Sequence, residues 1–127
     1  MNLFKDTMIQ AMAGMNLQSK RIGVTSENIS NVDTPGYKRK LLTIDKNPTI
    51  KNSFAETLIE LDPKPVESTY DPTHPLADQD GYILGSNVDL VIEMADMREA
   101  SRMYEANLNS FQQAKNMYRS LLEVLRR

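Results

Sequence analysis

Apolar residues recur at intervals of seven along the first thirty residues of the chain. The stripe that they form on an α-helix contains Met1, Met8, Met15, Ile22 and Ile29, and it is widened by Phe4, Ala11, Met12 and Val32. No proline interrupts this pattern. Gly14 and Gly23 each cost about 1 kcal/mol relative to alanine inside a helix. The pattern therefore predicts a helix over residues 1–32 that needs another element beside it to be stable.

A longer apolar periodicity occupies the last forty residues. Its positions step alternately by four and three, through Leu90, Met94, Met97, Ser101, Tyr104, Leu108, Phe111, Lys115, Tyr118, Leu122 and Leu125. Only Ser101 and Lys115 interrupt the apolar character of this heptad seam, and neither proline nor glycine follows Gly85. The pattern predicts a helix over residues 87–127, for which we expect Ser86 or Asn87 as the N-cap.

The segment between the two helices, residues 33–86, has a different character. It opens on a turn, because Pro35 pushes Thr34 out of the helical region and Gly36 accepts a positive φ. Five further prolines follow, and only residues 41–44, 58–61 and 82–84 resemble strands. We expect an irregular or short β-hairpin excursion.

The two terminal helices are predicted to pair as an antiparallel coiled-coil-like hairpin, which makes the fold class mainly α. Closing the intervening loop of about 55 residues costs on the order of 3.5 kcal/mol. Each buried seam residue returns roughly 1.5 to 3 kcal/mol, so a few of them suffice. The expected packing residues are Met8, Met15, Ile22 and Ile29 in the first helix and Leu90, Met94, Met97, Tyr104, Leu108, Phe111, Tyr118, Leu122 and Leu125 in the second.

Both helices carry more apolar surface than one partner helix covers. In the second helix the additional positions outside the seam are Val91, Ala100, Ala114, Leu121 and Val124. Such surplus surface indicates contacts with neighbouring chains, and a head-to-tail contact that does not close into a ring builds a filament.

The composition supports an extended helical protein. Hydrophobic residues make up 40% of the 127 residues, but aromatic residues only 6%, and tryptophan is absent. The formal net charge is -2, which argues against nucleic-acid binding. Residues 41–87 are acidic, with three Lys/Arg against eight Asp/Glu. The absence of cysteine excludes disulfides and thiolate chemistry.

The chain contains no apolar run close to the roughly 20 residues that span a bilayer. Lys5 and Asp6 interrupt the position where a signal-peptide core would lie. Any export from the cytoplasm is therefore expected to proceed without a cleaved signal peptide.

The sequence offers few candidates for catalysis. His74 is the only histidine, and this count excludes catalytic triads and metal sites that use more than one imidazole. His74 itself is expected in a turn between Pro72 and Pro75. Asp78, Asp80 and Gly81 resemble part of a calcium loop, but the closing bidentate glutamate is replaced by Asn87, which favours a polar turn. We expect no enzymatic activity, no cofactor, no metal and no small-molecule substrate.

Two charged features leave alternatives open. The basic run Lys38, Arg39 and Lys40 is a candidate electrostatic contact with lipid headgroups or with the acidic centre of a neighbouring chain, against the alternative of a solvated face. Lys115 either directs its ammonium group to solvent or fixes the register of the seam.

Two blocks of sequence resemble a known family. NISNVDTPGYKRK closes the first helix, with the turn motif Asn31, Asp33, Thr34, Pro35, Gly36 and Tyr37, and the stretch beginning YDPTHPLADQDGYILGSNVDL leads into the second. These blocks resemble the axial proteins of the bacterial flagellum and the flagella basal body rod protein family, and the second is similar to proximal-rod subunits. The chain departs from that pattern in its short first turn and in Gly85-Ser86, where a proline is usual.

The resemblance implies a structural subunit of the proximal rod that polymerises through its terminal helices into the drive shaft of the flagellum. It implies contacts with other proximal and distal rod proteins, the rod-to-membrane-ring adaptor, copies of the chain and the type III export apparatus, with the rod located in the periplasm. The alternative function is a soluble coiled-coil adaptor or export chaperone, which would form a discrete dimer rather than an open stack.

Overall fold

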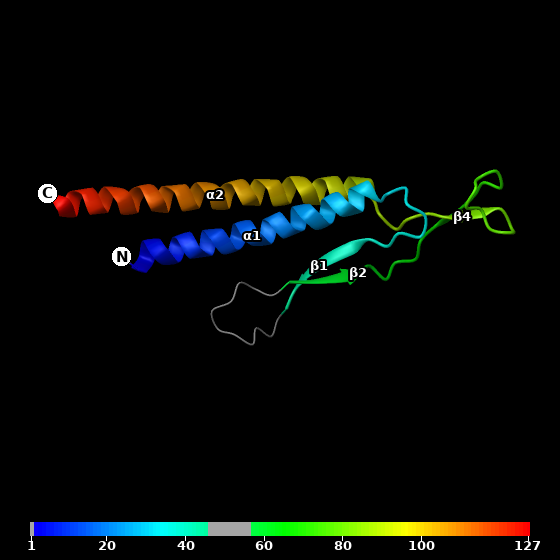
Figure 1. Cartoon of the computed structure of the whole chain (residues 1–127), viewed down its shortest axis with the longest axis horizontal. Coiled ribbons are helices and arrows are strands. Elements are labelled where there is room, and N and C mark those ends of the chain that lie inside the picture. The colour runs from blue at the N-terminus through cyan, green and yellow to red at the C-terminus, as the bar shows by residue number, and fades with distance from the viewer. Residues whose placement is uncertain (1, 46–56) are drawn as a thin grey trace. The chain divides into compact units, whose positions relative to one another are not determined.

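The computed structural model describes residues 2–45 and 57–127. Within them the elements follow the order α1 (Asn2–Ser30), β1 (Lys40–Ile44), β2 (Thr57–Leu61), β3 (Ser68–Tyr70), β4 (Tyr82–Leu84) and α2 (Leu90–Arg126), as Figure 1 shows. The predicted fold class is confirmed: along the sequence, two terminal helices precede and follow a central segment of small antiparallel hairpins. Met1 of the predicted stripe and Pro48 of the central segment lie outside the described residues.

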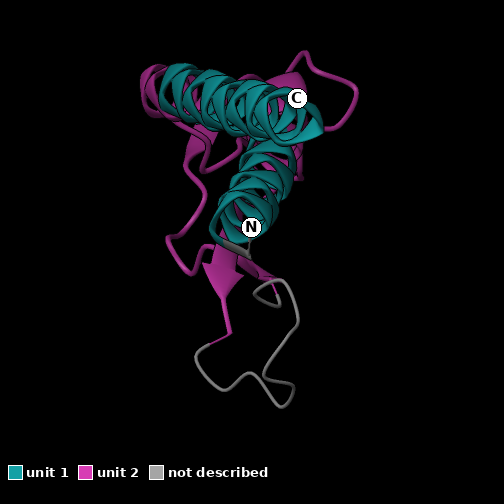
Figure 2. Ribbon diagram, turned by 90° about the vertical axis from the view of Figure 1, so that its left-hand side faces the viewer, with its two compact units in different colours: residues 1–22, 98–127 teal, residues 23–97 magenta. Residues whose placement is uncertain are grey.

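The chain forms two compact units, shown in teal and magenta in Figure 2. Unit 1 consists of residues 1–22 and 98–127, which are the first part of α1 and most of α2. Unit 2 consists of residues 23–97 and contains, among the described residues, the end of α1, the strands β1 to β4 and the start of α2.

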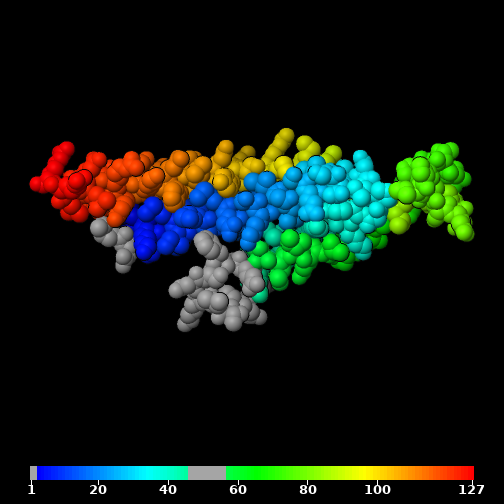
Figure 3. Space-filling view, in the orientation of Figure 1, coloured from blue at the N-terminus to red at the C-terminus, as the bar shows by residue number. Residues whose placement is uncertain are grey.

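The helices of unit 1 are antiparallel, because partners later in α1 lie earlier in α2. The rings of Phe4 and Tyr118 are 6.4 Å apart between centroids. Farther along, the guanidinium of Arg21 lies 3.9 Å from the carboxylate of Glu99. Figure 3 shows the blue side chains of α1 lying along the orange side chains of α2 in this unit.

Gly14 explains how closely the two helices of unit 1 approach each other. A Cβ atom at this position would lie 2.6 Å from the Nδ2 atom of Asn107 and 2.8 Å from its Cγ. The side chain of Asn107 therefore occupies the space that any other residue at position 14 would fill. Gly23, by contrast, has open space around it.

The face of α2 that is buried within the chain is offset from the predicted seam. Ala100 is 0% exposed and Ala114 is 5% exposed, and they lie seven and 21 residues after the buried Glu93, on the same heptad row. Met97, Tyr104, Phe111 and Tyr118 of the predicted seam flank this row and are half-buried. Small side chains let the helices approach, so residue size together with hydrophobicity sets the contact face.

The strands of unit 2 form two antiparallel pairs. β1 pairs with β2, with Lys40 opposite Leu61, and β3 pairs with β4, with Tyr70 opposite Tyr82. The three predicted strand-like runs are confirmed as β1, β2 and β4, whereas β3 was not predicted. Its sequence, Ser-Thr-Tyr, does not show the apolar alternation by which strands are recognised, and all three residues are exposed.

The predicted N-cap of α2 was wrong. The helix begins at Leu90, and the side chain of Asp89 accepts a hydrogen bond from the backbone N–H of Val91 at 3.0 Å. Ser86 and Asn87 are used elsewhere: the hydroxyl of Ser86 donates to the carbonyl of Val32, and the amide of Asn87 bonds to the loops around it.

Candidate functional site

The predicted packing residues divide into two groups by exposure. The half-buried members are Met8, Met15, Ile22 and Ile29 on α1 and Met97, Tyr104, Leu108, Phe111 and Tyr118 on α2. Leu90, Met94, Leu122 and Leu125 remain exposed, by between 36% and 67%. Ser101 and Lys115, which interrupt the predicted seam, are exposed as well.

The exposed side of α2 therefore forms a surface, which we call the open flank. It is made of Met94, Ser101, Leu108, Lys115 and Leu122, at intervals of seven, of which Leu108 is half-buried and the others are exposed. A row at heptad spacing that contains three apolar residues is suited to receive another helix. The open flank is the candidate for contacts with other chains.

The turn motif connects α1 to the strands of unit 2. The hydroxyl of Thr34 donates to the side-chain carbonyl of Asn31 at 3.0 Å, and the N–H of Tyr37 donates to the carbonyl of Thr34 at 3.1 Å. Gly36 has a φ of 72°, a conformation that glycine adopts without strain, and its N–H donates to the carbonyl of Gly85. Asp33 and Pro35 are exposed. The motif thus holds the chain after α1 against the segment that precedes α2.

Arg39 is the centre of an ion-pair cluster in unit 2. Its Nε donates to Glu93 Oε1, its Nη2 lies 3.1 Å from Asp96 Oδ2, and its Nη1 lies 3.7 Å from Asp62 Oδ2. Glu93 is 1% exposed, so its charge depends on this pairing. The cluster connects the residue before β1, the residue after β2 and the first turns of α2.

The side chain of Asn28 imitates a strand partner for Lys40. Its Oδ1 accepts the N–H of Lys40 at 2.9 Å, and its Nδ2 donates to the carbonyl of the same residue at 2.9 Å. The same amide donates to Glu93 and accepts the hydroxyl of Tyr37. Asn28 is 1% exposed, and these four bonds use both lone pairs and both hydrogens of its amide.

Asn87 has the same function on the other side of the cluster. Its Oδ1 accepts the N–H of Arg39, and its Nδ2 donates to the carbonyls of Asp62 at 3.2 Å and Lys64 at 2.8 Å. Two asparagine side chains therefore align the strand β1 and the residue after β2 with the helices of unit 2.

The predicted basic run is separated into three different environments. Burial lowers the pKa of Arg39, but the hydrogen bond and charge of Glu93, with the charges of Asp96 and Asp62, outweigh it and leave this pKa above its usual value. The hydrogen bond from Lys40 to Glu27, 2.5 Å long, raises the pKa of Lys40. Lys38 is exposed. Arg39 and Lys40 thus contact acidic groups of their own chain, and a contact of the run with a neighbour stays a prediction.

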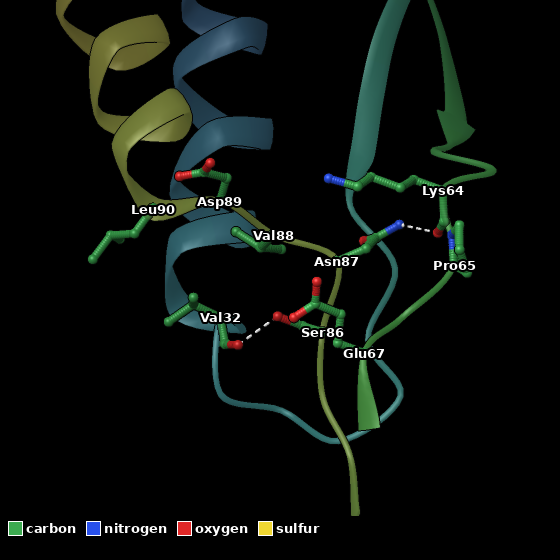
Figure 4. A pocket seen from close by; sticks show the side chains of 9 residues that line it. All are labelled: Val32, Lys64, Pro65, Glu67, Ser86, Asn87, Val88, Asp89 and Leu90. Carbon is green, nitrogen blue, oxygen red and sulfur yellow. Dashed lines mark hydrogen bonds between the residues drawn. The ribbon is translucent and has the colours of Figure 1, made fainter. Parts of the chain in front are cut away.

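A groove of about 390 Å³ lies beside the start of α2 in unit 2 (Figure 4). Val32, Val88 and Leu90 contribute apolar walls, and Glu67 and Asp89 contribute carboxylates. Figure 4 shows Lys64 reaching toward the helices from the loop that follows β2. Gly85 is needed close by, because a Cβ atom there would lie 2.8 Å from the carbonyl oxygen of Glu67.

The remaining candidates lie in the loop between β3 and β4. His74 accepts the N–H of Leu76 on its Nδ1 at 3.1 Å, and Asp78 accepts the N–H groups of Asp80 and Tyr82. These side chains form turns. In the part of the chain that the structure describes, no cluster of three potential metal ligands occurs. Its helices also include none with the length and apolarity to cross a membrane.

Sequence reasoning did not predict the residues that organise unit 2. Glu93 and Asn28 are buried and polar, and Asn87 was assigned to the helix cap. The sequence signal for Glu93 was its position seven residues before Ala100, on the small-residue face of α2. Nothing local marks Asn28 or Asn87, because their partners lie far away in sequence.

Comparison with known families assigns the class of protein. Residues 9–38 match the family described as flagella basal body rod protein, and residues 79–124 match the family described as flagellar basal body rod FlgEFG protein C-terminal. The first match covers most of α1 and the turn motif, and the second covers β4 and nearly all of α2. The two helices with their connecting turn are thus those of a flagellar basal-body rod protein.

Individual relatives narrow the class further. The chain is 36% identical to the flagellar basal-body rod protein FlgC of Agrobacterium fabrum over 126 residues, which cover 91% of each chain. It is 35% identical to FlgC of Borreliella burgdorferi, over 98% of this chain and 99% of the relative, and 31% identical to FlgC of Salmonella typhimurium, over 84% and 87%. The chain belongs to the FlgC family of flagellar basal-body rod proteins. This membership identifies a structural subunit of the flagellar basal body and gives no support to a soluble adaptor or export chaperone.

Proposed function

We propose that this chain is a subunit of the proximal rod that polymerises through its terminal helices and transmits motor torque. The observation that carries the proposal is the open flank of α2. Met94 on this flank is 46% exposed and Leu122 is 36% exposed, and both lie on a heptad row next to that of the buried Glu93, Ala100 and Ala114. A helix that carries exposed apolar residues beside its internal contact is suited to receive a neighbouring chain there.

The proposed partners are other proximal and distal rod subunits, copies of this chain and the adaptor between the rod and the membrane ring. The family relationship supports assembly with rod proteins. We further propose that the chain passes through the flagellar type III export apparatus without a cleaved signal and assembles in the periplasm. Catalysis has no place in this function, because a rod subunit acts through its contacts.

Charge substitutions on the open flank test the proposal. Met94→Asp and Leu108→Asp each place a carboxylate where an apolar neighbour is expected, at a cost of several kcal/mol if the contact is buried. In cells that carry each variant as the only copy of the gene, we expect swimming and isolated rods to be lost. Gln112→Asp, on an exposed position of the same helix, is the control and should leave both unchanged.

Met94→Asp is the more decisive variant, because Met94 is exposed in the single chain and its substitution should not disturb folding. Circular dichroism of the purified variant checks this point. Normal rods in cells with a folded Met94→Asp protein would contradict assembly through this flank. A stable, discrete dimer of the purified chain that never enters rods would instead indicate an adaptor.

A further inference from the structure

The groove beside the start of α2 exposes apolar surface next to acid groups. Leu90, one of the residues that line the groove, is 42% exposed, and Val32 and Val88 are further apolar lining residues. The carboxylates of Glu67 and Asp89 line the same groove. The volume of the groove is about 390 Å³.

The last turn of α2 has the complementary character. Val124 is 68% exposed and Leu125 is 67% exposed. Arg126 and Arg127 follow directly and are exposed as well. This end of unit 1 therefore combines two apolar side chains with two cations.

We propose that the groove of one chain receives the last turn of α2 from a second copy of the chain. Val124 and Leu125 would cover Leu90 and the valine wall, and the arginines would lie near Glu67 and Asp89. In this arrangement groups of like charge would not face each other, and the apolar surfaces of both chains would be removed from water. The proposal specifies one contact of the rod assembly proposed above and rests on it.

The contact is heterologous, because the groove and the helix end are different surfaces. A pair of chains joined in this way still has one free groove and one free helix end. Further copies can therefore add at both sites, which is the property that an axial polymer requires.

Lys64 allows the proposal to predict the direction in which each charge substitution changes binding. It lines the same groove as Glu67 and Asp89, so these three side chains together carry one negative charge. Changing Lys64 to an acid should strengthen the binding of an arginine-bearing helix end, and changing Glu67 to a base should weaken it. A purely apolar contact would respond to neither change in this opposed way.

Disulfide cross-linking tests the contact, since the chain contains no cysteine of its own. Two purified full-length chains that differ in a size tag are mixed, one with Pro65→Cys on the groove wall and the other with Val124→Cys at the helix end. We expect mixed disulfide dimers in at least about fivefold greater yield than with Glu60→Cys, an exposed position on β2, in place of Pro65→Cys.

Charge variants give the second readout. Adding Glu67→Lys to the groove chain should lower the yield by about fivefold, and Lys64→Glu should raise it. Adding Arg126→Glu to the other chain should restore the yield with Glu67→Lys. A Pro65→Cys yield no higher than that of Glu60→Cys, or equal responses to both charge changes, would overturn the proposal.

Cross-linking in isolated basal bodies separates this inference from the proposed function. If Pro65→Cys joins a protein of a different mass there, the occupant is another rod subunit and the proposal of a second copy is wrong. If the groove contact fails but Met94→Asp still blocks rods, the inference falls and the rod function stands.

Discussion

Replacing Arg39 by methionine isolates the energetic importance of the ion-pair cluster. The substitution keeps most of the aliphatic volume but removes the guanidinium that contacts Glu93, Asp62 and Asp96. Glu93 is 1% exposed, so its carboxylate would be left buried without its cationic partner. Breaking a buried ion pair in this way typically destabilises a protein by about 3–5 kcal/mol.

Two features of the structure place the effect at the low end of this range. The Nδ2 of Asn28 still donates to Glu93 Oε2 at 3.3 Å, and the side chain of Arg39 is 21% exposed, so water reaches the vacated space. We therefore expect a loss of about 3 kcal/mol in the free energy of opening of unit 2, or more than about 100-fold in the opening equilibrium.

Native-state hydrogen exchange measured by NMR gives this free energy directly. The N–H of Lys40 is the best reporter, because it donates to the buried Oδ1 of Asn28 and is released when unit 2 opens. Lys38→Met, which removes an exposed cation one residue away from Arg39, is the matched control and should change exchange by less than about 0.5 kcal/mol.

A double substitution shows whether the loss comes from the unpaired charge. Arg39→Met combined with Glu93→Leu leaves no buried carboxylate and should recover most of the protection. The reasoning is refuted if Arg39→Met and Lys38→Met slow or speed the exchange of Lys40 equally. It is also refuted if the double variant opens more readily than Arg39→Met alone.

Four further substitutions test other parts of the structure. Gly23→Ala should stabilise α1 by about 1 kcal/mol in urea denaturation, because a Cβ atom at this position meets open space. Gly14→Ala should gain little or lose stability, because its Cβ would collide with Asn107. Equal gains in stability for both variants would show that the helices are farther apart. Gly85→Ala should lower the stability of unit 2 by about 1–3 kcal/mol, since its Cβ would lie 2.8 Å from the carbonyl oxygen of Glu67, and unchanged exchange at the N–H of Gly36 would contradict this. Burial, followed by the charge of Glu27, raises the pKa of Tyr37 above 10.0 in the folded state. The folded state therefore holds the phenolic proton more tightly than the unfolded state does. This contribution to stability is present below pH 10.0 and is lost as the pH rises through the higher folded pKa. The tyrosinate absorbance of the native chain minus that of Tyr37→Phe should have its midpoint above pH 10.0, and a midpoint at or below this value would show that Tyr37 is not shielded.

The periodic parts of the fold could be predicted from the sequence. Heptad spacing indicated both helices, and short apolar runs indicated β1, β2 and β4, because these patterns reflect local geometry. The start of α2 was wrong because tertiary contacts recruit Ser86 and Asn87 and leave the cap to Asp89. Propensity describes what a residue favours alone, and a distant partner overrides it.

The arrangement of charges was harder to predict. Lys38, Arg39 and Lys40 are adjacent in sequence, but only the fold shows that Arg39 and Lys40 contact carboxylates from separate segments. The buried face of α2 posed the same problem, since a hydrophobicity pattern favours Met94 and Leu108 over alanines. Ala100 is nevertheless fully buried, because close approach of a neighbour rewards a small side chain.

The amide side chains of Asn28 and Asn87 have a consequence for the conditions in which unit 2 keeps its form. A carboxamide neither gains nor loses a proton in the range that proteins encounter, so the bonds from Asn28 to Lys40 and from Asn87 to Asp62 and Lys64 do not respond to acidity. Had carboxylates or imidazoles filled these two positions, the alignment of strand and helix would change with the medium. The two asparagine links between the helices and the strands therefore contain no group that titrates, in contrast to the ion pairs of Arg39 beside them.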